Sequence, residues 1–139
     1  MLRDCDSLPT RVSQVISQFF KSRFDLEPTE TLVVVQNEIV MVRIKGIISK
    51  AEVELAKTKK GLRLVDEMYR ELFEKSEPLL ESMLKSLTGM EIKNIQTNIN
   101  YQSSECVHII EFTEDIEQRL RKDSQEARKL SDGKEGDEI

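Results

Sequence analysis

Apolar side chains recur at helical spacing near the start of the chain. Between Leu8 and Phe24 they are separated by three, one, three and one positions: Val12, Val15, Ile16, Phe19 and Phe20. This spacing places them on one face of a helix, and Ser7 or Thr10 can cap its start. We therefore predict an amphipathic helix in which one stripe faces a core.

The next segment has the alternation of a β-hairpin. Pro28 disfavours continuation of the helix, and Thr31–Val35 is rich in β-branched residues. A turn at Gln36–Glu38 leads into Ile39–Ile44, where apolar positions alternate with Met41, Arg43 and Lys45. The second strand therefore presents Arg43 and Lys45 on a face that is accessible to water or to a partner.

Two helices are predicted after the hairpin. Ser49 and Glu52 have the spacing of a capping box, which predicts a short helix from Lys50 to about Lys57. A loop at Lys57–Gly61 then leads to a long helix with apolar side chains every three or four residues from Leu62 to a C-terminal cap at Gly89. The stripe keeps its phase across Pro78, so we predict a kink there and no break.

A second hairpin follows the long helix. Apolar and amide side chains alternate from Asn94 to Tyr101, and Cys106–Thr113 forms the partner strand. The order helix, β-β, helix, long helix, β-β predicts an α+β fold with about four antiparallel strands and helices on one face. We expect one domain over residues 1–113, a polar helical extension over 114–130 and a disordered acidic tail over 131–139.

Composition changes this picture little. The chain has 139 residues, the size of one domain, with 38% hydrophobic and 34% charged residues. It contains no apolar run long enough to span a membrane and no signal-peptide pattern, so we expect a cytoplasmic protein. The net charge is −5, yet Val40–Arg63 carries seven basic and two acidic residues. That segment could bind an acidic partner, whereas the overall charge argues against general nucleic-acid binding.

The sequence offers little catalytic chemistry. It contains no phosphate-binding glycine loop, nucleophile elbow or zinc-protease motif, and His108 is its one histidine. Cys106 and His108 lie two positions apart on a predicted strand, but no further metal ligands lie nearby, so we interpret them as packed side chains. We predict a protein that is not an enzyme and has no cofactor.

The candidate site is a set of partner-binding residues. They share the basic segment or the predicted loop: Arg43, Lys45, Lys57, Thr58, Lys59, Lys60, Gly61 and Arg63. An alternative function is RNA binding, since a loop between two helices also resembles the Gly-x-x-Gly loop of type II KH domains. Here, however, Thr58 stands at the position of the first glycine.

Self-association is a further expectation. The long helix could be shared between two subunits, and the strand Cys106–Thr113 has apolar residues on both faces: Val107, Ile109, Ile110 and Phe112. A symmetric dimer would bury such surface. The alternative is a monomer with a two-layer core.

Several segments resemble the MpsC family over about Val12 to Thr113: Val42–Gly46, Ala51–Val65, Arg70–Leu72, Pro78–Glu81 and Leu87–Gly89. The most specific part is the Leu-Ala-Lys-Thr-x-x-Gly stretch that ends at Gly61. The resemblance implies an accessory role in a cation-translocating, membrane-potential-generating system whose membrane subunits are also linked to inorganic-carbon uptake. It implies a membrane transport subunit as partner and supplies no catalytic residues.

Overall fold

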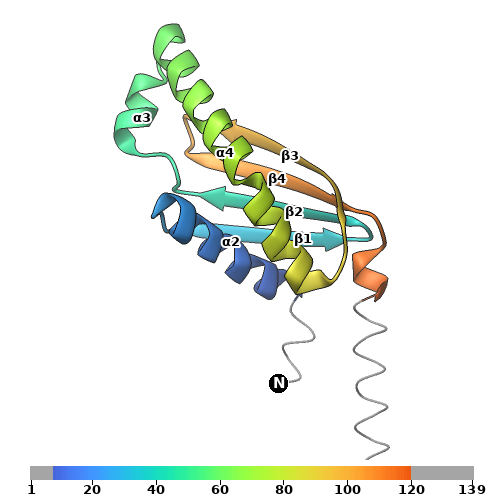
Figure 1. The fold of residues 1–139 in the computed structure, drawn as a ribbon. Helices are drawn as coiled ribbons and strands as arrows, with labels where there is room; N and C mark the ends of the chain where they lie inside the picture. Colours follow the sequence, from blue (N-terminus) through green and yellow to red (C-terminus); the bar gives the residue numbers. More distant parts are fainter. Residues whose placement is uncertain (1–7, 120–139) are drawn as a thin grey trace, which may run out of the picture.

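The computed structural model describes residues 8–119, which form one antiparallel sheet with helices on one of its faces (Figure 1). The elements in chain order are α2 (Leu8–Phe24), β1 (Glu30–Gln36), β2 (Ile39–Lys45), α3 (Lys50–Leu55), α4 (Lys59–Thr88), β3 (Ile92–Asn100) and β4 (Glu105–Phe112). The predicted α+β class and element order are therefore confirmed.

The sheet has the strand order β1-β2-β4-β3, with all neighbours antiparallel. The two strands of each hairpin pair with each other, and β2 pairs with β4 in the centre of the sheet. Alternate residues of the central strands are buried under the helices: Val40, Val42, Ile44, Cys106, His108, Ile110 and Phe112. The intervening side chains, Arg43 and Val107 among them, lie on the opposite face, which no helix in residues 8–119 covers (Figure 1).

Aromatic rings join the two long helices to the sheet. Phe20 of α2 lies 6.1 Å from Phe73 of α4, measured between ring centroids, and Phe73 lies 5.6 Å from His108 of β4. Edge-to-face contacts of this kind add to the free energy of area burial. The apolar stripe predicted for the first helix is thus the one that packs, with Val12, Ile16, Phe19 and Phe20 all buried.

Helix α4 continues through Pro78 and ends where Gly89 adopts a left-handed conformation, with φ at 70°. Pro78 lies on the exposed side, so water can bind the Glu74 carbonyl that loses its helical donor. The predicted continuity across the proline is confirmed. The predicted start at Leu62 was wrong, because the helix begins at Lys59.

The described chain ends in a helical turn over residues 116–119. Asp115 accepts a hydrogen bond from the backbone N–H of Gln118 at 2.8 Å, and Ile116 is fully buried. The remainder of the expected extension to residue 130, and the tail over 131–139, lie outside the described residues. Over residues 8–119, no helix has both the length and the hydropathy required to cross a membrane.

Candidate partner-binding site

A tight corner joins α3 to α4. Ser49 and Glu52 form the expected capping box at the start of α3. At the start of α4, the Thr58 hydroxyl accepts a hydrogen bond from the backbone N–H of Gly61 at 3.1 Å. Each cap satisfies a backbone donor that the first helical turn leaves free. Only three residues, 56–58, separate the two helices, so the corner has little freedom.

Gly61 lets the two helices approach. A Cβ atom at this position would lie 1.8 Å from the Leu55 carbonyl oxygen and 3.0 Å from the Thr58 hydroxyl oxygen. No side chain fits at such distances. Ala56 lies buried in the same corner. The Leu-Ala-Lys-Thr-x-x-Gly stretch therefore encodes the corner itself: a buried alanine, a capping threonine and a glycine at the close approach.

The predicted loop at Lys57–Gly61 was wrong in its extent. Lys59, Lys60 and Gly61 form the first turn of α4. The reason is the cap, because Thr58 offers its hydroxyl to the third residue after it and so starts the helix there. The corner also differs from a Gly-x-x-Gly loop, since the close approach that Gly61 permits is already occupied by Leu55.

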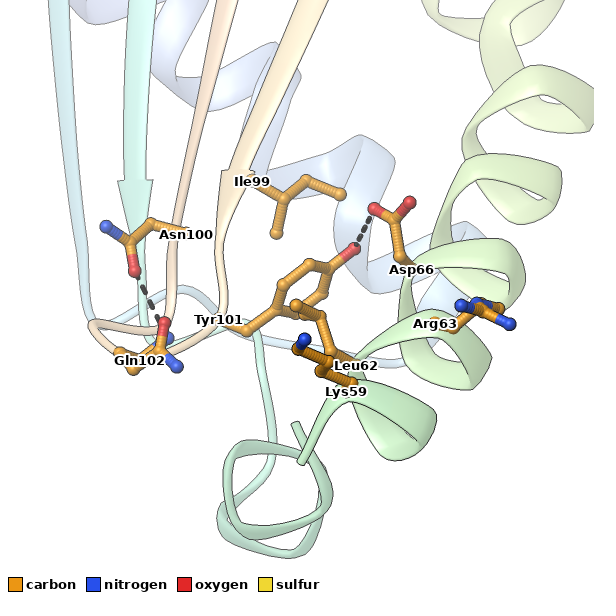
Figure 2. Close-up of a pocket in the computed structure, with 8 residues that line it drawn as sticks. All are labelled: Lys59, Leu62, Arg63, Asp66, Ile99, Asn100, Tyr101 and Gln102. Atoms are coloured by element: carbon orange, nitrogen blue, oxygen red, sulfur yellow. Dashed lines mark hydrogen bonds between the residues drawn. The ribbon is translucent and has the colours of Figure 1, made fainter. Parts of the chain in front are cut away.

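A pocket of about 610 Å³ opens between the first turns of α4 and the end of β3 (Figure 2). Its lining comes from both elements: Lys59, Leu62, Arg63, Asp66, Ile99, Asn100, Tyr101 and Gln102. Figure 2 shows these side chains, with the Tyr101 hydroxyl pointing to Asp66. The pocket thus combines an apolar wall with a cationic rim.

Two tyrosine–carboxylate hydrogen bonds hold this region together. The Tyr101 hydroxyl donates to Asp66 at 2.9 Å, and the Tyr69 hydroxyl donates to Glu52 at 2.6 Å. Burial first, and the carboxylate second, raise the pKa of both tyrosines. Burial raises the pKa of Asp66, but the hydrogen bonds from Arg70 and Tyr101 and the Arg70 charge outweigh it, and the net pKa is lowered. Asp66 therefore stays ionised at neutral pH.

Three exposed cations at the corner have no ionic partner within residues 8–119: Lys59, Lys60 and Arg63. Lys57, in contrast, pairs with Glu54 at 2.9 Å. The first turn of α4 also contains no acidic residue. Positive charge near a helix N-terminus is unfavourable, so an anion bound here would relieve it.

Apolar side chains lie exposed beside these cations. Figure 1 shows α3 and the first turns of α4 extending beyond the sheet, which explains their exposure. Four apolar residues here are each between 38% and 53% exposed: Leu55, Leu62, Leu64 and Met68. We call these four residues and the three unpaired cations the corner surface. Such a combination of cationic and apolar groups is typical of a docking surface.

The other two predicted residues lie elsewhere. Arg43 and Lys45 project from the open face of the sheet, where Glu105 of the adjacent strand lies 3.9 Å from Arg43 and 3.7 Å from Lys45. Lys45 also lies 3.6 Å from Glu30. The structure thus divides the eight predicted residues between two surfaces, and on the sheet the cations are already paired.

Cys106 and His108 lie on one buried face, as expected for packed side chains. His108 Nδ1 lies 2.9 Å from the Thr97 hydroxyl oxygen, and its Nε2 lies 3.6 Å from Cys106 Sγ. Burial lowers the pKa of His108 to about 4 and raises that of Cys106 to about 12. In the described part of the chain, no cluster of three or more potential metal ligands is present.

The sequence prediction missed Asp66 and Tyr101 as pocket residues. The sequence pattern marks Tyr101 only as an apolar strand position, and it does not single out Asp66. Their hydrogen bond joins positions 35 residues apart. The available signal was the strand alternation, which directs Tyr101 toward the helices.

The chain matches the family described as Na+-translocating membrane potential-generating system (MpsC) over residues 6–114. It belongs to the MpsC family. A relative from Bacillus subtilis (strain 168), the uncharacterized protein YbcI, is 23% identical over 122 residues, which cover 88% of this chain and 98% of YbcI. No solved structure matches. Family membership covers the whole corner and both hairpins.

Proposed function

We propose that this MpsC-family protein is a non-enzymatic accessory protein that binds an acidic segment of a membrane transport subunit through its corner surface. The observation that carries the proposal is that Lys59, Lys60 and Arg63 are exposed and unpaired within residues 8–119, beside exposed leucines. The family description, which names a cation-translocating system, supports the choice of partner. The partner's carboxylates would neutralise the cations while its apolar side chains cover the leucines.

The composition of the corner surface favours a protein over RNA as the partner. Single-stranded nucleic acid binds to cationic grooves that contain aromatic stacking platforms. The residues exposed beside these cations are aliphatic, namely Leu62, Leu64 and Met68, and the net charge of the chain is −5. Tyr101, the aromatic residue of the adjacent pocket, is buried and its hydroxyl donates a hydrogen bond to Asp66, so its ring is not an exposed stacking platform.

Charge reversal at the corner surface tests this proposal. We expect the wild-type protein to recover a cation-translocating membrane subunit from a detergent extract of the source cells. The triple variant Lys59→Glu, Lys60→Glu, Arg63→Glu should weaken binding to that subunit by at least about tenfold, because attraction becomes repulsion. Binding should be measured by titration with the purified subunit at two salt concentrations.

The matched control reverses three other exposed lysines: Lys75→Glu, Lys85→Glu and Lys93→Glu. Each of them pairs with a carboxylate, Glu71, Glu91 and Glu111 respectively. This variant has the same net charge and should retain the subunit. An equal loss of subunit binding in both variants would contradict the proposal. The proposal would also be contradicted if the wild type bound a single-stranded RNA oligonucleotide or anionic phospholipid vesicles more strongly than the subunit.

A further inference from the structure

Strand β3 lies at the edge of the sheet, with Lys93 and a pairing irregularity at its start, but its segment from Asn94 to Asn100 carries none of the usual protection against pairing with another strand. The order β1-β2-β4-β3 leaves its outer side without a partner strand within residues 8–119. Native edge strands are commonly protected by lysine, proline or a bulge. From Asn94 to Ser103 the chain contains no charged residue and no proline, and the irregularity in pairing lies before this segment, between Ile92 and Asn94.

The sequence of this edge is self-complementary about its centre. Consider two β3 strands that pair antiparallel with Thr97 at the centre. Each residue of one copy then lies opposite the residue of the other copy for which the two residue numbers sum to 194. Asn94 would then face Asn100, Ile95 would face Ile99, and Gln96 would face Asn98 of the other copy. Amide meets amide and isoleucine meets isoleucine, which is the condition that a two-fold symmetric interface imposes.

The charges beside this edge are self-complementary as well. A groove of about 380 Å³ between α4 and β3 is lined on the helix side by Asp66, Arg70, Phe73, Glu74 and Glu77. Arg70, which pairs with Asp66 at 2.7 Å, lies nearer the N-terminus of α4, whereas Glu74 and Glu77, which have no ion pair within residues 8–119, lie nearer its C-terminus. Burial, followed by the adjacent Glu81 and Glu74, raises the pKa of Glu77.

We propose that two copies of this chain pair through β3 to form a continuous antiparallel sheet with a two-fold axis at Thr97. The axis is perpendicular to the sheet, so both α4 helices lie on the same face and run antiparallel. Arg70 of one copy then approaches Glu77 of its partner. This proposal is independent of the proposed function, since the corner surface takes no part in it.

Lysines on the exposed side of β3 test the pairing. The double variant Gln96→Lys, Asn98→Lys places like charges opposite each other twice across the axis. We expect sedimentation velocity to show a wild-type dimer and a variant that associates at least about tenfold more weakly. Both side chains are exposed, so the circular dichroism spectrum and the monomer fold should not change.

The control variant Leu32→Lys, Val34→Lys carries the same lysines on β1, the other edge strand, where both residues are exposed. It should remain a dimer. A charge swap adds a second test: Arg70→Glu alone should weaken the dimer, and Arg70→Glu combined with Glu77→Arg should restore it. The proposal is overturned if the wild type is monomeric at millimolar concentration, or if only the β1 variant dissociates, because the interface would then include β1 and not β3.

Discussion

Replacement of Gly61 by alanine is expected to destabilise the protein by about 3 kcal/mol, although alanine is the better helix former. In an exposed helix this change stabilises by up to about 1 kcal/mol. Here the new methyl group would lie 1.8 Å from the Leu55 carbonyl oxygen, which is a backbone atom, so α3 and α4 must separate to accept it. The measurement is the free energy of unfolding from urea denaturation followed by circular dichroism.

Gly89→Ala is the matched control for this substitution. Gly89 has a φ of 70°, but an added Cβ would meet nothing within 4 Å. The control should therefore lose only roughly 1 kcal/mol, the cost of a left-handed alanine. If Gly61→Ala instead equals or exceeds the wild type in stability, the close approach between the helices that defines the corner does not exist in solution.

The corner also shows what the sequence could and could not reveal. Alternation and helical stripes predicted each strand and helix to within a few residues because local burial controls those patterns. The segment at Lys57–Gly61 looked like a loop because a glycine follows three lysines and a threonine. Its true conformation depends on a contact between Gly61 and Leu55, which becomes visible only when the two helices cross.

The candidate site was predicted in part for a similar reason. The basic segment supplied the predicted site residues, but the sequence did not indicate that β2 pairs with β4. That pairing brings Glu105 to Arg43 and Lys45 and removes them from the set of unpaired cations. Lys59 and Arg63 keep their exposure because the part of α4 that carries them extends beyond the sheet (Figure 1). Which strands of the two hairpins are neighbours in the sheet depends on long-range contacts, and local periodicity does not reveal it.

Acidification is expected to destabilise the fold through His108, with a loss of about 3 kcal/mol between pH 7 and pH 4. The imidazole has an ordinary pKa of 6.5 and a pKa of about 4 in the folded protein, because burial disfavours its charged form. The unfolded chain therefore binds the proton more tightly. Its contribution to stability is complete above pH 6.5 and is lost as the pH falls toward 4. Urea denaturation at half-unit pH intervals measures this loss.

His108→Gln separates this effect from other titrations. Glutamine can still hydrogen-bond to Thr97 but has no charge to gain, so the pH dependence of its unfolding free energy should be flatter than that of the wild type between pH 6.5 and 4. Because the pKa of Asp66 is lowered, this carboxylate affects the unfolding free energy only below this pH window. The raised pKa of Glu77 increases the unfolding free energy as the pH falls, and it does so equally in both proteins. Phe20, Phe73, Thr97 and Cys106 surround the imidazole, and none of them carries a compensating charge at these pH values. Parallel pH profiles for the two proteins would mean that water reaches His108 in the folded state, and the packing of both long helices over β4 would then be looser than the structure shows.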